Sequence, residues 1–182
     1  MLSEVSDLKS SDLGGKLSDA LIKIQKCPKS VNGSIVFIGM DSPTIPCNAI
    51  LDAASQAAGE SLNGDSKIIP KSSSRAVIFP AIDGGYTLLA LPPRCPIEVF
   101  ERVAWSQPIT CISQQDALRR NGITDIVVGD TFPDIDEPED LKYLAVNYFL
   151  NADQSGIRPS VTTELPHLSE FIFRRMDLFT SE

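Results

Sequence analysis

Residues 75–92, RAVIFPAIDGGYTLLALP, decide the fold because they place two strand-like runs around a pair of glycines. Gly84-Gly85 between two such runs is a common hairpin turn. The alternative is a loop shaped around a ligand, since glycine accepts positive φ angles and lets a bound molecule approach the backbone. Pro80 interrupts the first run, which predicts a loop wider than two residues.

Further strand-like and helical patterns lie on both sides of this stretch. The apolar runs at 35–40 (IVFIGM) and 124–128 (TDIVV) predict two more strands, the first of them buried on both faces as in parallel sheets. Helical patterns occupy residues 12–24, 47–60, 96–103, 106–122, 137–151 and 165–179, with Ser106 and Asp136 as expected N-caps. This alternation predicts an α/β fold with a mostly parallel sheet.

The length and composition fit one soluble domain. The chain has 182 residues and a formal net charge of -8, which argues against a broad basic surface for nucleic acid. Four widely spaced cysteines form no CxxC pair, as expected of reduced thiols in a cytoplasmic protein. The chain shows no secretion signal and no apolar run that could span a membrane, so we expect no membrane partner.

Acidic residues follow two of the predicted strands. Asp41 follows the run IVFIGM, at the end of a strand where open α/β sheets bind ligands, although a turn or helix-capping role also fits. Asp134 and Asp136 are two apart, so in an extended segment their side chains point the same way. A hard cation would offset their repulsion. N-capping by Asp136 is the alternative, but it leaves Asp134 unexplained.

Single aromatic and basic residues give weaker indications. Trp105 and Ser106 could contact a base or sugar, although an aromatic before a helix more commonly packs into the protein. His167 is the only histidine and lies in the C-terminal segment, which argues against a histidine-dependent catalytic triad.

Five motifs in this order resemble a known family. They are DLGGKL, FIGMDSP, FPAIDGGYTLLAL, FERVAWSQPIT and FPDIDEPEDL, which together span roughly residues 10–146. The order resembles that of mostly bacterial proteins described as glycosyltransferase-A-like transferases, or radical-SAM/selenodomain-associated transferases. The family pattern is G-x-D-x-P, G-P-A-x-D-G-G-Y, W-S-T and D-x-D-x-P-x-D-L. Gln107 departs from it by replacing the threonine of W-S-T.

The resemblance implies a Rossmann-like α/β/α sandwich, the nucleotide-diphospho-sugar transferase fold, over residues 12–150. Residues 1–11 are then a flexible N-terminus, and residues 151–182 a linker and helical extension. The resemblance assigns Asp41, Asp134 and Asp136 to a site for Mg²⁺ or Mn²⁺. It also implies that the loop of Asp83, Gly84, Gly85 and Tyr86 borders the substrate, with Asp83 as the catalytic candidate and with Trp105 and Ser106 nearby.

One departure concerns the start of the family domain. Family members begin with a strand and a basic K-T-R-L loop for the nucleotide phosphates, and this chain starts near the later segment, so the resemblance implies an N-terminally truncated domain. We expect either residues 157–179 or a second subunit to cover the sheet edge that this leaves.

These patterns leave three hypotheses for the function. The first is a metal-dependent glycosyltransferase or nucleotidyltransferase acting on a nucleotide or nucleotide sugar. The second is a non-catalytic remnant or interaction protein with the same fold. The third is one half of a split enzyme, with the missing part supplied by another chain.

Overall fold

A computed structural model describes residues 13–27, 33–59, 74–150 and 166–175. The chain divides into two compact units, which we describe separately. The first comprises residues 1–39 and 45–132, and the second comprises residues 40–44 and 133–182. The expected flexible segment 1–11 and residues 151–165 of the expected linker and helical extension (151–182) lie outside the described residues, and the domain boundaries expected from the sequence stay predictions.

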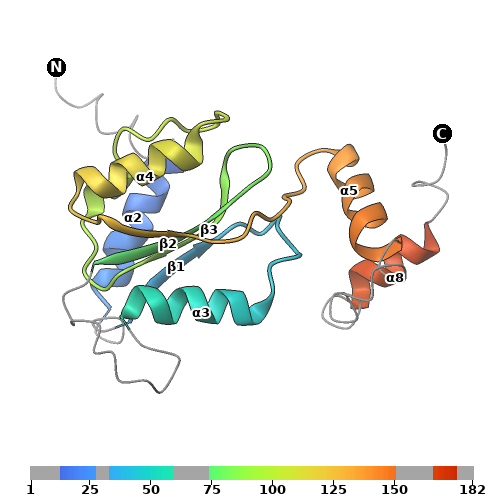
Figure 1. The fold of residues 1–182 in the computed structure, drawn as a ribbon, viewed down its shortest axis with the longest axis horizontal. Helices are drawn as coiled ribbons and strands as arrows, with labels where there is room; N and C mark the ends of the chain where they lie inside the picture. The colour runs from blue at the N-terminus through green and yellow to red at the C-terminus, as the bar shows by residue number, and fades with distance from the viewer. Residues whose placement is uncertain (1–12, 28–32, 60–73, 151–165, 176–182) are drawn as a thin grey trace. The chain divides into compact units, whose positions relative to one another are not determined.

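The first unit contains a sheet of four strands in the order β1-β3-β2-β4 (Figure 1). The strands are β1 (Ile35–Ile38), β2 (Arg75–Pro80), β3 (Tyr86–Leu91) and β4 (Asp125–Val128). β3 pairs antiparallel with both β1 and β2, whereas β4 pairs parallel with β2. The prediction of a mostly parallel sheet was therefore wrong, because β3 follows β2 through a short loop and must run back beside it.

The hairpin predicted from the glycine stretch is confirmed. β2 and β3 are joined by residues 81–85, and their register shifts at Phe79 and Pro80. The loop is thus wider than two residues, as expected from the proline. β1 is an end strand of the sheet rather than a strand buried on both faces, and its Ile38 side chain is exposed.

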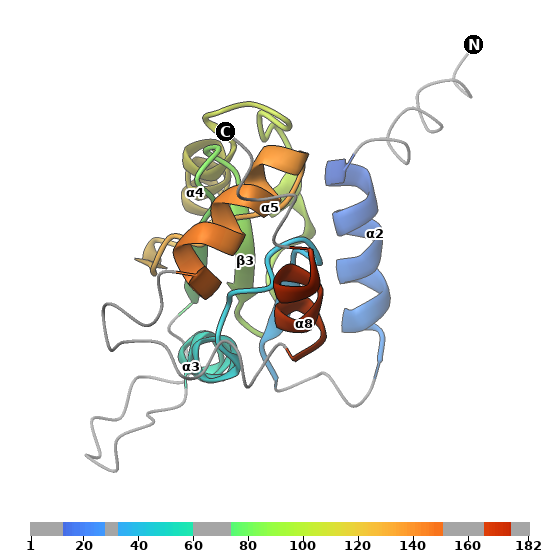
Figure 2. The same cartoon turned by 90° about the vertical axis from the view of Figure 1, so that its right-hand side faces the viewer.

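Helices cover both faces of this sheet. Helix α3 (Cys47–Ala58) lies on one face, and α2 (Leu13–Gln25), the 3-10 helix η2 (Ile97–Phe100) and α4 (Thr110–Arg120) lie on the other (Figure 1). Figure 2 shows α3 nearly end-on beside β3, with α2 running upright on the opposite side. The predicted α/β class is confirmed, with the first unit built as three layers.

Alternation along the strands produces two cores. Ala76 and Ile78 of β2 pack with α2, η2 and α4, whereas Val77 and Phe79 pack with α3. In β3, Leu89 faces the first set of helices, in keeping with the two-residue period of a strand. The central strands β2 and β3 are almost fully buried, so the hairpin loop is anchored on the most buried part of the fold.

The described part of the second unit contains three helical segments besides the non-helical residues 40–44 and 133–137. It contains α5 (Pro138–Leu144), a π-helical continuation η3 (Ala145–Leu150) and α8 (Pro166–Arg174). Leu144, Ala145 and Ile172 form its small core. In the part of the chain that the structure describes, no helix combines the length and apolar character needed to cross a membrane.

Two helix starts differ from the sequence-based expectation. Helix α4 begins at Thr110 with Ile109 as its N-cap, and Ser106 lies before it with a positive φ of 54°. Helix α5 has Glu137 as its N-cap rather than Asp136. Ser106 was wrongly assigned because the chain turns between it and α4, where the Thr110 hydroxyl accepts from the Gln107 N–H and donates to the Ala104 carbonyl. Asp136 was wrongly assigned because the adjacent Glu137 forms the capping box with Asp140.

Candidate functional site

The candidate site lies where three strands end. β1 and β2 both run antiparallel to β3, and β4 runs parallel to β2, so β1, β2 and β4 share one direction. Asp41 follows the end of β1, Asp83 follows the end of β2, and Asp134 follows the end of β4. Open α/β sheets bind ligands at this edge.

The loop that carries Asp83 is held by its own hydrogen bonds. The Gly85 N–H donates to Oδ1 of Asp83 at 2.7 Å, and the Ala81 N–H donates to the Gly85 carbonyl at 3.0 Å. A side chain at Gly85 would place its Cβ 3.0 Å from Oδ1 of Asp83. The carboxylate therefore has a defined orientation while it stays exposed to solvent.

Helix α4 supports the same loop from behind. The Cys111 N–H donates to the Gly84 carbonyl at 2.9 Å, and a Cβ on Gly84 would lie 2.0 Å from the Pro108 carbonyl oxygen. Gly84 also has a positive φ of 94°. These contacts explain both glycines of the motif without a ligand, so their expected role in substrate binding stays a prediction.

The aromatic residues expected near a substrate pack within the first unit. The Tyr86 hydroxyl donates to Oε1 of Gln114 at 3.2 Å. Trp105 packs against the core, and a Cβ on Gly14 of α2 would lie 2.6 Å from its indole nitrogen. The Ser106 side chain is exposed. Contacts of these three residues with a substrate stay predictions.

The chain itself keeps Asp134 near the Asp83 loop. The Phe132 N–H donates to the Pro80 carbonyl at 3.0 Å, and Phe132 forms a parallel bridge with Ala81. Asp134 is two residues further on, a distance that an extended chain covers in about 7 Å. Because residues from Pro133 onward belong to the second unit, this covalent link is what limits the separation of the acids.

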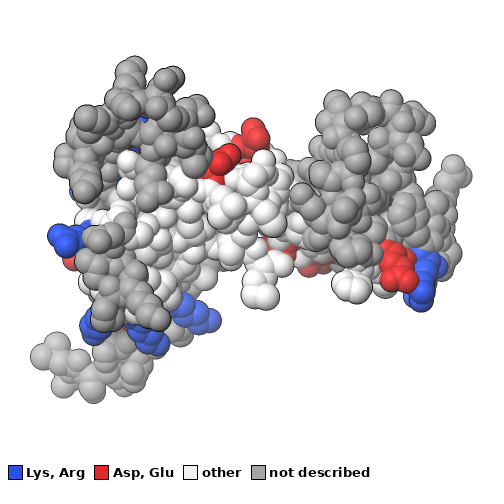
Figure 3. Space-filling model, turned by 90° about the horizontal axis from the view of Figure 1, so that it is seen from below, with Lys and Arg blue, Asp and Glu red and all other residues white. Residues whose placement is uncertain are grey.

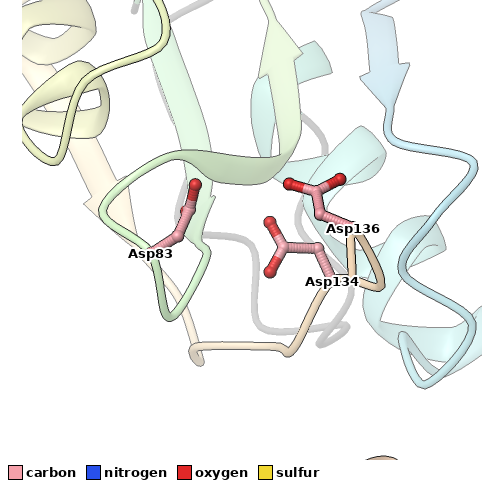
Figure 4. A group of neighbouring side chains, drawn as sticks. All are labelled: Asp83, Asp134 and Asp136. Atoms are coloured by element: carbon pink, nitrogen blue, oxygen red, sulfur yellow. The ribbon is translucent and has the colours of Figure 1, made fainter. Parts of the chain in front are cut away.

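Two carboxylates form a pair in the second unit. Asp134 and Asp136 each offer an oxygen, and these oxygens lie within 4.8 Å of each other. Figure 4 shows Asp83 on the loop between β2 and β3, and Asp134 and Asp136 on the segment before α5. At this distance two like charges repel by about 3 kcal/mol if the effective dielectric constant is near 20.

The donor set fits a hard divalent cation. Mg²⁺ binds carboxylate oxygens at about 2.1 Å, so two oxygens on one ion are at most about 4.2 Å apart. The limit of 4.8 Å between the Asp134 and Asp136 oxygens is close to this value. Oxygen-only donors suit Mg²⁺ or Mn²⁺ better than softer metals.

Asp41 is adjacent to this pair through its backbone. Its carbonyl accepts a hydrogen bond from the Ile135 N–H at 2.9 Å, which ties the turn after β1 to the segment between the paired acids. Its exposed carboxylate is not grouped with the Asp134–Asp136 pair, so its expected role as a metal ligand stays a prediction. In the same turn, the hydroxyls of Ser42 and Thr44 are buried and have no hydrogen-bond partner among the described residues.

The capping pattern of α5 leaves the Asp136 side chain available. Glu137 caps the helix, and Oδ2 of Asp140 accepts hydrogen bonds from the Glu137 N–H at 2.8 Å and the Asp136 N–H at 3.1 Å. The capping alternative considered for the Asp136 carboxylate therefore does not apply, because that task belongs to Glu137.

Basic side chains are dispersed on one face of the protein (Figure 3). On the face drawn in Figure 3, the described basic side chains form small separate groups rather than one continuous patch. The expectation that the protein has no nucleic-acid partner stays a prediction, in line with the net charge of -8.

Gln114 and Pro108, two residues that support the loop of Asp83, were not identified from the sequence. Gln114 is fully buried, and Pro108 fills the space beside Gly84. A signal for Gln114 was available, because it shares the apolar face of α4 with Cys111 and Leu118 at spacings of three and four residues. Nothing in the sequence indicates that Pro108 lies against Gly84.

The chain matches a protein family and is similar to a solved structure. The family described as "Uncharacterized protein conserved in bacteria (DUF2064)" matches residues 3–107. A protein described as a "putative nucleotide-diphospho-sugar transferase" from Desulfovibrio desulfuricans G20 is similar in structure, with a TM-score of 0.61 and 23% identity. The similarity covers 90% of this chain and 62% of that one. No curated protein matches the chain.

This structural similarity shows the fold alone, an α/β fold shared with that solved structure. The chain spans about three-fifths of the length of the solved structure that it matches. The radical-SAM association and the truncation implied by the motifs are not addressed by either comparison, and both stay predictions, as does a cytoplasmic location.

Proposed function

The chain belongs to the DUF2064 family and has the fold of a nucleotide-diphospho-sugar transferase relative, and from these two premises we propose that it is a metal-dependent transferase. Its substrate is a nucleotide diphosphate compound, such as a nucleotide sugar, and the group transferred is glycosyl or nucleotidyl. The observation that carries this proposal is the pair of Asp134 and Asp136, whose carboxylate oxygens lie within 4.8 Å of each other, shortly after Phe132 donates its N–H to the Pro80 carbonyl.

In this proposal the carboxylates of Asp83, Asp134 and Asp136 hold Mg²⁺ or Mn²⁺. A bound divalent ion stabilises the charge that develops on a leaving diphosphate. The Asp83 carboxylate is oriented by the Gly85 N–H, so it reaches its position without ordering a flexible side chain on binding. Asp41 is a further metal ligand in this proposal, supported by the hydrogen bond between its carbonyl and the Ile135 N–H.

Calorimetric titration of the full chain with Mn²⁺, alone and with a panel of nucleoside diphosphates and nucleotide sugars, tests the proposal. We expect Mn²⁺ to bind and to strengthen binding of at least one nucleotide. Asp134→Asn and Asp136→Asn should weaken the Mn²⁺ affinity by more than about tenfold, since even residues that only support metal ligands often contribute that much.

Asp52→Asn is the matched control, because Asp52 is an exposed acid on α3 and is not one of the proposed metal ligands. It should leave the Mn²⁺ affinity unchanged. If the intact chain binds neither Mn²⁺ nor any nucleotide in the panel, the proposal is wrong and a non-catalytic interaction protein becomes the better hypothesis. If binding appears only after a second protein is added, the split-enzyme hypothesis takes its place.

A further inference from the structure

A buried amide connects the Asp83 loop to the core of the first unit. The Gln114 side chain has an exposed fraction of 0%, and both ends of its amide are used. Its Oε1 accepts from the Tyr86 hydroxyl at 3.2 Å, and its Nε2 donates to the Val99 carbonyl at 2.8 Å. Helix α4, the first residue of β3 and the 3-10 helix η2 are thereby joined through one side chain.

The direction of these hydrogen bonds is fixed by chemistry. The Val99 carbonyl can only accept, so the Gln114 amide presents Nε2 to it and Oε1 to Tyr86. The Tyr86 hydroxyl, whose pKa is raised by burial and by the neighbouring Cys111 thiol, keeps its proton and donates to Oε1. An apolar side chain could fill the same space without the cost of burying an amide, so the specific contribution of Gln114 is orientation.

Tyr86 stands at the end of the loop that carries Asp83. The loop is bonded at one end by the Gly85 carbonyl to Ala81 and at its centre by the Gly84 carbonyl to the Cys111 N–H. Gln114 lies on α4 one turn after Cys111, so the same helix fixes the loop at Gly84 and at Tyr86. A change in the Gln114–Tyr86 pair should therefore alter the position of the Asp83 carboxylate.

We infer that Gln114 is a positioning residue, which sets the Asp83 loop through the Tyr86 hydroxyl and so tunes cation binding by the Asp83 carboxylate. The cation part of this inference rests on the proposed function, whereas the loop part does not. Residues that orient metal ligands typically change metal affinity by about 10- to 100-fold when replaced.

The experiment compares Gln114→Met and Tyr86→Phe with a matched control. Gln25→Met removes a similar bond, since Nε2 of Gln25 on α2 donates to the Cys95 carbonyl at 2.6 Å, but it does not touch the loop. Backbone amide hydrogen exchange is measured by NMR on the full chains without metal, and Mn²⁺ affinity is measured by calorimetry. Tyr86→Phe removes one hydroxyl only, so it serves if Gln114→Met does not fold.

We expect amide exchange at Ala81, Gly85 and Cys111 to become about tenfold faster in both test variants and to stay unchanged in Gln25→Met. We also expect Mn²⁺ to bind both variants about tenfold more weakly. Unchanged exchange in the loop would overturn the inference, and so would unchanged Mn²⁺ affinity where the wild type binds Mn²⁺. If the wild type binds no Mn²⁺, the proposed function fails and the exchange rates alone decide whether Gln114 positions the loop.

Discussion

Gly84 has a backbone conformation and a neighbour that together exclude a side chain. Its φ of 94° is disfavoured for residues with a Cβ, and an added Cβ would lie 2.0 Å from the Pro108 carbonyl oxygen. Gly122 has a similar φ of 83°, but no atom lies within 4 Å of its added Cβ. Alanine substitutions at these two glycines therefore distinguish the destabilisation caused by backbone conformation from that caused by a packing clash.

We predict that Gly84→Ala lowers the free energy of unfolding by more than about 2 kcal/mol, because strain and a backbone clash act together. Gly122→Ala should cost about 1 kcal/mol, from the backbone conformation alone. Urea denaturation of both variants measures the difference. Equal losses would mean that Pro108 moves away at little cost, so that α4 does not hold the loop rigidly.

Asp140 shows how neighbouring acids in one segment can have different tasks. It accepts hydrogen bonds from two backbone N–H groups ahead of α5, whereas the carboxylates of Asp134 and Asp136 form a pair. Sequence alone presents five acids in the stretch DIDEPED without distinguishing these tasks.

At the scale of the helix, Asp140→Ala should lower the free energy of unfolding by about 1 kcal/mol, the usual contribution of a lost cap. Asp136→Asn should change the stability less but weaken Mn²⁺ binding, because the Asp136 carboxylate is not the cap. Thermal denaturation and calorimetry on both variants test this division. A large loss of stability in Asp136→Asn without an effect on Mn²⁺ binding would reverse the assignment.

The β2–β3 hairpin is the element that sets the sheet. Its short loop forces β3 to run against β2, and β1 then pairs with β3 instead of lying beside β2. β1, β2 and β4 nevertheless share a direction, which brings the acids after them to one edge. The prediction that acidic residues follow the strand ends at one edge therefore holds, although the prediction of parallel pairing was wrong.

At the scale of the whole molecule, buried ionisable groups link stability to pH. Burial, with a smaller contribution from Glu98, raises the pKa of Cys95 from 9.0 to about 12. Between these values the unfolded chain releases the thiol proton while the folded protein retains it, so stability is full below pH 9 and falls as the pH rises.

We predict that the free energy of unfolding decreases above pH 9, by about 1.4 kcal/mol per pH unit for each such group. Tyr86 and Cys111, whose pKa values are also raised by burial, add to this slope. Urea denaturation between pH 8 and 11 under reducing conditions measures it, and Cys95→Ala should make the slope shallower. An identical slope in Cys95→Ala would show that the thiol ionises without opening the core.

Addition of a metal provides a second test on the whole chain. If Mn²⁺ binds only the folded state, a concentration 100 times the dissociation constant should raise the free energy of unfolding by about 2.7 kcal/mol. Chelation with EDTA should reverse the gain. Asp134→Asn should lose most of it, whereas Asp52→Asn should keep it.

The sequence by itself determined the α/β class, the hairpin around Gly84-Gly85 and the placement of acids after the ends of strands. These features follow from local patterns, since side-chain periodicity and glycine conformation act over a few residues. Tertiary structure decided the direction of strand pairing and the N-caps of α4 and α5.

Tertiary structure also decided that Gln114 and Pro108 lie behind the Asp83 loop. Gln114 is 28 residues from its partner Tyr86, and Pro108 is far along the chain from Gly84. Contacts over such separations depend on how helices pack against the sheet, which no local pattern encodes. The sequence shows which acids follow the strands, but only the tertiary structure shows that Gln114 and Pro108 hold the loop of Asp83.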